Sequence, residues 1–192
     1  MEARVAPNTI SLLSVLCAAV AGACLLLQAG SGLALRIVLL VAAAAFIQLR
    51  LLCNMLDGMV AIEGGLKTPM GDIFNDFPDR ISDIVILVCT GYAISGVPLG
   101  AELGWVAALL AVLTAYVRLL GGSLGLAQDF GGPMAKPHRM ALMTAACLLQ
   151  GVAASTDQGE RVLTVALVLI VGGSLLTIWR RTHRIAVALI SR

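Results

Sequence analysis

The stretch NMLDGMVAIEGGLKTPMGDIFNDFPDRISD, residues Asn54–Asp83, decides the fold of this chain. It combines six carboxylates with two asparagines, and it lies between long apolar segments. The carboxylates are those of Asp57, Glu63, Asp72, Asp76, Asp79 and Asp83, and the asparagines are Asn54 and Asn75. A carboxylate at membrane depth is costly unless another group compensates its charge, so the stretch predicts a functional site among membrane helices.

If this stretch forms two helices separated by a break near Gly64 and Gly65, the polar residues of each helix lie on one face. Each residue of an α-helix is rotated by about 100° from the one before it, so the polar residues of the first helix lie on one face. The oxygen-bearing side chains of the second helix lie within a sector about 100° wide. The first face carries Arg50, Asn54, Asp57 and Ala61, and the second carries Asp72, Asn75, Asp76, Asp79 and Asp83. Hard divalent ions prefer carboxylate, amide and water oxygens, so the two faces together predict a cation cage.

The composition indicates an integral membrane protein. Of 192 residues, 59% are hydrophobic and only 12% are charged, which is too few charges for an ordinary soluble domain. Apolar runs of about 20 residues recur along the whole length. They predict one all-α domain, residues 1–192, with six transmembrane helices at about 9–28, 35–60, 72–96, 103–122, 139–156 and 162–179. The first run lacks a small-residue cleavage site, so we expect an uncleaved helix.

Basic residues near the helix ends predict the orientation. One side of the six-helix chain carries both termini and the residues Arg4, Lys67, Lys136, Arg139, Arg180, Arg181 and Arg184. The opposite side has Arg36 and Arg161. The acidic motif therefore faces the cytoplasm. The tail RRTHRIAVALISR, residues 180–192, fits either an amphipathic helix on anionic lipid or a frayed end.

Several kinds of partner are excluded by composition. A net charge of +2, without interleaved aromatic and basic residues, argues against nucleic acid. The five cysteines occur singly within apolar segments, which supports neither a zinc site nor a disulfide framework.

The acidic stretch resembles the signature of the CDP-alcohol phosphatidyltransferases, D-x-x-D-G-x-x-A-R, eight residues, then G-x-x-x-D-x-x-x-D. Every spacing is kept here, in the frame Asn54, Asp57, Gly58, Ala61, Ile62, Gly71, Asn75 and Asp79. The segments PNTIS, residues 7–11, and KPHR, residues 136–139, also resemble the family. The resemblance therefore covers the full chain, although its specific motif spans residues 54–79.

Three positions depart from the family pattern. Asparagine replaces the first and third aspartates, at Asn54 and Asn75, and isoleucine replaces arginine at Ile62. The resemblance implies two divalent ions, bridged in part by the third aspartate. An amide oxygen ligates a cation without adding charge, so we expect the second ion to be weakened most. Asp72, Asp76 and Asp83 either compensate for the lost charge or are solvated residues at a helix entry.

The resemblance implies an integral-membrane transferase. Such an enzyme moves a phosphatidyl or similar substituted phosphate group from a CDP-linked lipid, such as CDP-diacylglycerol, to an acceptor alcohol and releases CMP. It uses one or two Mg²⁺ or Mn²⁺ ions, held by Asn54, Asp57, Asn75, Asp76 and Asp79. Asp79 is also expected to be the general base that takes the hydroxyl proton. The resemblance further favours a homodimer.

Six further residues are expected to bind the donor. Gly58, Ala61 and Gly71 belong to the motif, where the backbone approaches the nucleotide or diphosphate closely. Arg80, Arg118 and Arg139 are candidates for the phosphate contact that Ile62 cannot make, because the guanidinium fork suits phosphate.

Two other functions compete with transfer. The chain could be an inactive family member that binds a CDP-lipid, which the two asparagines and Ile62 favour. It could also be a small ion-coupled transporter, since transporters also place acids at membrane depth. Transporters commonly show repeated halves, whereas the acids here cluster in the second and third helices.

Overall fold

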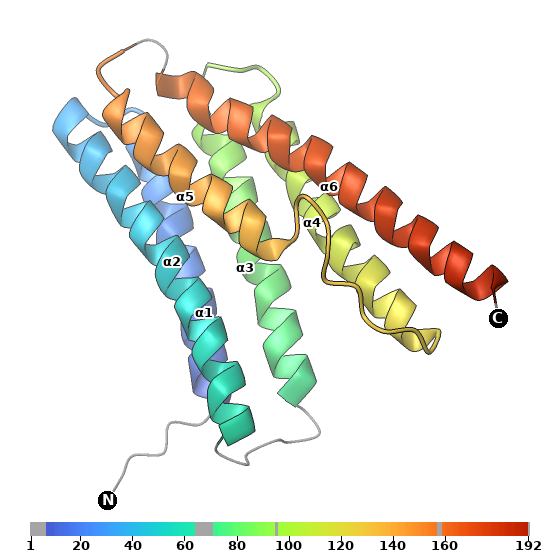
Figure 1. Ribbon diagram of the computed structural model, residues 1–192. Helices are drawn as coiled ribbons and strands as arrows, with labels where there is room; N and C mark the ends of the chain where they lie inside the picture. The colour runs from blue at the N-terminus through green and yellow to red at the C-terminus, as the bar shows by residue number, and fades with distance from the viewer. Residues whose placement is uncertain (1–6, 64–70, 95, 157–158, 192) are drawn as a thin grey trace, which may run out of the picture.

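The computed structural model describes residues 7–63, 71–94, 96–156 and 159–191, which form six α-helices (Figure 1). For residues 7–9, 57–63, 71, 72, 74, 75, 159 and 160 it describes the course of the helix and not the side chains. The helices are α1 Pro7–Gln28, α2 Leu33–Glu63, α3 Gly71–Ala93, α4 Gly100–Ser123, α5 Lys136–Val152 and α6 Gly159–Ile190. The expected all-α fold and the number of helices are confirmed.

The helix boundaries agree with the predicted ones to within a few residues, except at the C-terminus. There α6 continues to Ile190, past the predicted end at residue 179. The tail is therefore a direct continuation of α6, because residues 180–190 contain no glycine or proline that would end a helix. At 1.5 Å per residue, its 32 residues extend about 48 Å.

Four helices, α1, α2, α4 and α6, are long and apolar enough to cross a membrane. The other two fall short for different reasons. Helix α3 carries four charged residues, Asp76, Asp79, Arg80 and Asp83, and α5 has only 17 residues. The expectation of six transmembrane helices is thus supported for four of them on length and composition.

The helices neighbour one another in the closed order α1, α2, α5, α6, α4, α3 and back to α1. Buried apolar residues from every helix fill the inside of this ring, including Ala21 of α1, Ile47 of α2, Ile86 of α3 and Met143 of α5. Exposed leucines and valines cover the outside of the long helices, as expected of a surface that faces lipid. The charged face of α3 turns inward, where the other helices supply its partners.

Helices α3 and α4 touch backbone to backbone through glycines. A Cβ atom on Gly91 would lie 2.6 Å from the Gly100 carbonyl oxygen and 2.7 Å from the Gly104 Cα. One on Gly104 would lie 2.8 Å from the Leu87 carbonyl oxygen. Small residues of this kind let membrane helices approach closely, and they fix the distance between α3 and α4.

We predict that Gly104→Ala destabilises the protein by about 1–3 kcal/mol, because the added methyl group meets backbone that cannot move aside. The matched control is Gly172→Ala in α6, where a Cβ would have no atom within 4 Å. Thermal unfolding of the two purified variants in detergent measures the difference. Equal melting temperatures would contradict the close α3–α4 contact.

Candidate functional site

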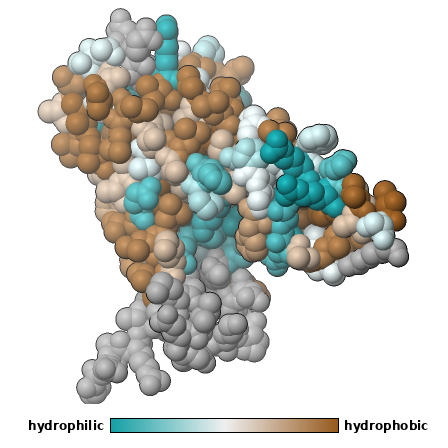
Figure 2. All heavy atoms as spheres, viewed as in Figure 1, coloured by the Kyte–Doolittle hydropathy of each residue, from teal (hydrophilic) through white to brown (hydrophobic). Residues whose placement is uncertain are grey.

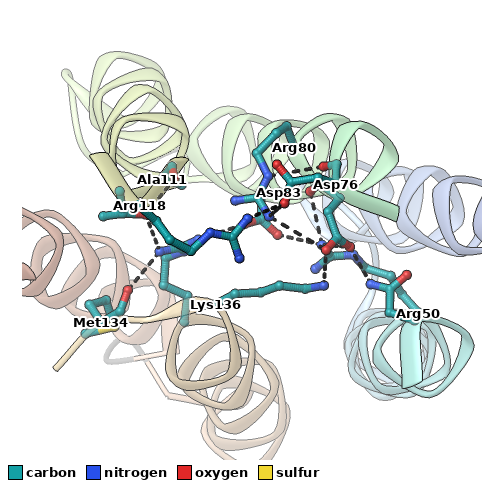
Figure 3. Close-up of polar contacts among 12 residues, drawn as sticks. Arg50, Asp76, Arg80, Asp83, Ala111, Arg118, Met134 and Lys136 are labelled. Atoms are coloured by element: carbon teal, nitrogen blue, oxygen red, sulfur yellow. Dashed lines mark hydrogen bonds and ion pairs between the residues drawn. The ribbon is translucent and has the colours of Figure 1, made fainter. Parts of the chain in front are cut away.

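The polar site lies inside the helix ring, beside the first half of α3. Helix α5 begins part-way along the bundle (Figure 1), and its first residue is Lys136. Figure 3 shows Lys136 extending from α5 toward Arg50 of α2. On α3, Asp76, Asp79 and Asp83 follow one another at intervals that keep them near one face of the helix.

Asp79 is held by four side chains, which come from α2, α3 and α5. Its Oδ1 accepts a hydrogen bond from the Asn54 amide and lies 3.4 Å from Arg50 Nη2. Its Oδ2 contacts the Lys136 ammonium and lies 3.6 Å from Arg80 Nη2. Arg50 also donates to the Asp79 backbone carbonyl at 3.1 Å. Asp79 is therefore fixed in position and surrounded by cations.

Asp83 forms the fully buried part of the same network. Its Oδ1 lies 2.7 Å from Arg50 Nη2, and its Oδ2 accepts a hydrogen bond from Arg139 Nη2 at 2.9 Å. Arg139 Nη1 in turn donates to Thr114 Oγ1 at 3.1 Å and to the Met134 carbonyl at 2.8 Å. Arg50, Asp83 and Arg139 are each at most 1% exposed. The network thus joins α2, α3, α4 and α5 without contact to solvent.

Asp76 lies nearer the rim of the site. Its Oδ1 accepts a hydrogen bond from Arg118 Nη2 at 2.5 Å and lies 3.5 Å from Arg80 Nη2. The Arg118 guanidinium stacks over the Phe130 ring, with Cζ 4.8 Å from the ring centroid. Such cation–π stacking holds the guanidinium in place while its remaining N–H groups stay available.

These side chains surround a cavity of about 370 Å³. Five basic residues line it together with two acids: Arg80, Arg118, Lys136, Arg139 and Arg181, with Asp76 and Asp79. Figure 2 shows hydrophilic residues gathered between two hydrophobic parts of the molecular face. A recess with an excess of positive charge and apolar walls concentrates anions, so this cavity suits an anionic ligand.

The loop between α4 and α5 contributes one wall of the cavity and is fastened to α6. Arg181 Nε donates to the Gly131 carbonyl at 3.0 Å, and the Met134 backbone N–H donates to Thr177 Oγ1 at 3.1 Å. Gly132 has φ +137°, and a Cβ there would lie 2.5 Å from Thr177 Cγ2. Only glycine fits this position without strain.

The same loop carries an ion pair at the surface. Asp129 Oδ2 accepts a hydrogen bond from Arg184 Nη1 at 2.8 Å, and Asp129 Oδ1 accepts one from the Gly131 backbone N–H. Partial burial alone would raise the pKa of Asp129, but these two hydrogen bonds and the Arg184 charge lower it below its ordinary value. The pair therefore attaches the loop to α6 across the neutral pH range.

The structure brings together several of the predicted site residues. Asn54 and Asp79 are in contact, and Arg80, Arg118 and Arg139 line the cavity with Asp76 and Asp79. For Asp57, Gly58, Ala61, Gly71 and Asn75 the structure describes only the course of the helix, so their expected roles stay predictions. Among the side chains that are described, no three acidic, histidine or cysteine residues converge on a common point. The cation cage therefore stays a prediction, and the described acids instead contact arginine or lysine.

Three further residues belong to the site although no role in it was predicted for them, namely Arg50, Lys136 and Arg181. Arg50 was expected on the polar face of its helix, one turn before Asn54, but its pairing with the acids of α3 was not predicted. Lys136 and Arg181 were interpreted as charges that orient the chain in the membrane. Their place in the cavity depends on where α5 begins and how α6 packs, which the sequence pattern does not specify.

Comparison with known proteins agrees with this architecture. The family model for CDP-alcohol phosphatidyltransferases matches residues 4–179. The fold is similar to that of Mycobacterium tuberculosis phosphatidylinositol phosphate synthase (PgsA1) in complex with manganese and citrate, with a TM-score of 0.74 and 24% identity over 94% of this chain and 82% of that chain. The same protein with CDP-DAG bound gives a TM-score of 0.74 and 24% identity over 95% and 87% of the two chains. Among curated proteins, none matches the sequence.

We predict that Asp83→Asn destabilises the protein by about 3–5 kcal/mol, because it leaves the buried Arg139 guanidinium without its anion and Arg50 with only the longer contact to Asp79. The control is Asp129→Asn, which removes the exposed pair with Arg184 and should cost at most about 1 kcal/mol. Denaturation of both variants in mixed micelles compares them. A similar loss of stability in both variants would mean that burial does not determine how much the Asp83 ion pairs contribute to the free energy of unfolding.

Proposed function

Because the chain belongs to the CDP-alcohol phosphatidyltransferase family, we propose that it transfers a phosphatidyl or similar substituted phosphate group from a CDP-linked lipid to an acceptor alcohol and releases CMP. The observation that carries this proposal is the basic cavity beside Asp79, the last acid of the family motif. Four apolar helices long enough to cross a bilayer make the chain an integral membrane protein.

We propose CDP-diacylglycerol as the donor and Mg²⁺ or Mn²⁺ as the cofactor. The similar synthase has been solved with CDP-DAG and with manganese, which supports both assignments. The donor chemistry of this chain fits such an ion, since the Asn54 amide nitrogen donates to Asp79 and its amide oxygen is of the ligand type that divalent ions accept. Asp57, assisted by Asn54 and Asn75, would hold the ion, which neutralises the diphosphate and the leaving CMP when bound. Gly58, Ala61 and Gly71 would lie along the nucleotide.

Asp79 is the proposed general base. It lines the cavity, and Arg50 and Asn54 hold its Oδ1, so that Oδ2 is oriented toward Lys136 at the cavity wall. The acceptor hydroxyl gives its proton to this carboxylate as its oxygen attacks the phosphorus attached to the lipid. The new P–O bond forms while the bond from that phosphorus to CMP breaks. The surrounding cations contribute by holding the carboxylate of the base in a fixed orientation.

We propose that the acceptor is a phosphorylated alcohol. Five basic residues face two acids around the cavity, and the guanidinium groups of Arg80, Arg118 and Arg181 can bind phosphate with their planar forks. The volume of about 370 Å³ suits a small polar molecule at the lower end of the usual range for ligand pockets. An acceptor without a negative charge would leave this positive charge uncompensated.

The cavity is proposed to face the cytoplasm of the cell that makes this protein, in its inner or cytoplasmic membrane. The end of the bundle with the motif carries most of the lysines and arginines, as the positive-inside rule requires. Lipid chains would reach the site from the bilayer and the acceptor from the aqueous side. A homodimer is proposed on the family resemblance.

The direct test is to incubate the purified protein with CDP-diacylglycerol, Mg²⁺ or Mn²⁺, and a panel of acceptors that includes glycerol phosphate, inositol phosphate and serine. We expect CMP release with a phosphorylated acceptor and a lipid product whose mass identifies it. Tight binding of CDP-diacylglycerol without CMP release would favour an inactive binding protein. Uptake into proteoliposomes without chemical change would favour a transporter.

Asp79→Asn should lower the transfer rate by about 10²–10⁴-fold, because an amide cannot take the hydroxyl proton. Glu102→Gln makes the same chemical change on an exposed residue in the first turn of α4, at the opposite end of the bundle, and should leave the rate unchanged. Melting temperatures and binding of CDP-diacylglycerol must be checked for both variants. Near-normal turnover of a folded Asp79→Asn variant would exclude Asp79 as the base.

Arg118→Gln should raise the KM for a phosphorylated acceptor by about 10–100-fold, since a hydrogen bond to a charged group contributes roughly 1.5–3 kcal/mol. The KM for CDP-diacylglycerol should change little. Arg180→Gln, on the exposed face of α6, removes the same charge away from the cavity and is the control. Steady-state kinetics with each substrate varied in turn separates the two constants. An unchanged acceptor KM would place the acceptor elsewhere.

A further inference from the structure

Both oxygens of the Asp79 carboxylate contact groups of the protein itself. The Asn54 amide lies closest to Oδ1, and the Lys136 ammonium lies closest to Oδ2. The Arg50 and Arg80 guanidinium groups add positive charge at 3.4 Å from Oδ1 and 3.6 Å from Oδ2. A cation that binds Asp79 would have to compete with these groups.

The amide of Asn54 makes a contact with Asp79 that a carboxylate at the same position could not make. The Asn54 amide nitrogen donates directly to Asp79 Oδ1. A carboxylate at position 54 in the same place would put two negative oxygens against each other, which is unfavourable unless a cation lies between them. The amide removes the repulsion by donating a proton of its own. A direct hydrogen bond thus joins the two side chains, and no bridging ion is needed to hold them together.

Two further donors contribute full positive charge at this position. Arg50 is fully buried and contacts both Asp79 and Asp83 through Nη2. Lys136 reaches Asp79 from the first residue of α5. With Arg80, three cations contact the single charge of Asp79. A divalent ion at Asp79 would be repelled by all of them at short range.

We propose that Asn54, Arg50 and Lys136 take the place of one divalent ion at Asp79, so that this chain binds one ion where the family resemblance implies two. This inference rests on the proposed function and deepens it. Arg50, Asn54 and Lys136 are positioning residues that act through Asp79. Asp79 is then a base held by the protein, and the remaining ion serves the diphosphate of the donor lipid.

The first test is the number of Mn²⁺ ions bound by the purified full-length protein with CDP-diacylglycerol present, measured from the EPR signal of free Mn²⁺. We expect one ion per chain. Two ions per chain would overturn this inference and leave the proposed transfer intact. Binding of none would overturn both this inference and the metal dependence of the proposed function, and a CMP-release assay in the presence of EDTA would show the latter independently.

The second test compares Asn54→Asp with Asn54→Ala. The aspartate recreates a carboxylate pair at Asp79, so we expect a second bound Mn²⁺ and a melting temperature that rises more steeply with Mn²⁺ than that of the wild type. The alanine removes the hydrogen bond without adding charge, so it should gain no second Mn²⁺. Equal stoichiometry and equal slopes for both variants would overturn the role assigned to Asn54.

Lys136 provides a separate test that keeps Asn54 in place. Lys136→Gln frees Asp79 Oδ2 from its ammonium partner, so a second Mn²⁺ should bind, with lower affinity than the first. Lys136→Arg keeps the charge and should retain one ion. If both variants bind one ion with the wild-type affinity, the ammonium does not replace an ion and the inference fails for Lys136.

Discussion

The ion pairs that Arg50 makes with Asp79 and Asp83 are the interaction on which the rest of the structure depends. A guanidinium fully buried among apolar helices is tolerable only if anions compensate its charge, and α3 supplies two of them. Because Asp83 also binds Arg139, the same pairs determine where α5 lies against α3. Removing one member leaves the others charged and buried. The position of the helices and the chemistry of the site are thus set by one network.

This network explains how a membrane protein can hold so charged a helix. Each acid of α3 in the described part of the site contacts a basic residue from another helix: Asp76 meets Arg118, Asp79 meets Arg50 and Lys136, and Asp83 meets Arg139 as well as Arg50. The helix is therefore nearly neutral within the ring, although its sequence is too polar for a membrane span. The excess positive charge that remains faces the cavity, where a phosphorylated substrate would neutralise it.

Much of this architecture could be predicted from the sequence, because apolar runs of membrane length and a motif with fixed spacing are strong signals. The helix limits near Gln28 and Ser123 follow directly from where the apolar runs end. The partners of the acids could not be predicted in the same way. Rows of carboxylates and amides on two facing helices fit a cage for cations, but they equally fit a set of acids neutralised by basic residues from elsewhere in the chain. The Lys136 contact depends on the short length of α5, and the Arg139 contact depends on residues 56 positions apart. Local periodicity carries no information about such pairings.

The late position of Arg139 in the chain bears on how the protein is made. Arg50 precedes α3 and can accompany it into the membrane, whereas Lys136, Arg118 and Arg139 are synthesised after it. During synthesis α3 therefore has fewer positive partners than negative charges until α4 and α5 have followed it. The buried charge network around α3 is complete only when most of the chain has been made, so the place of this helix is a property of the assembled bundle rather than of its own hydrophobicity.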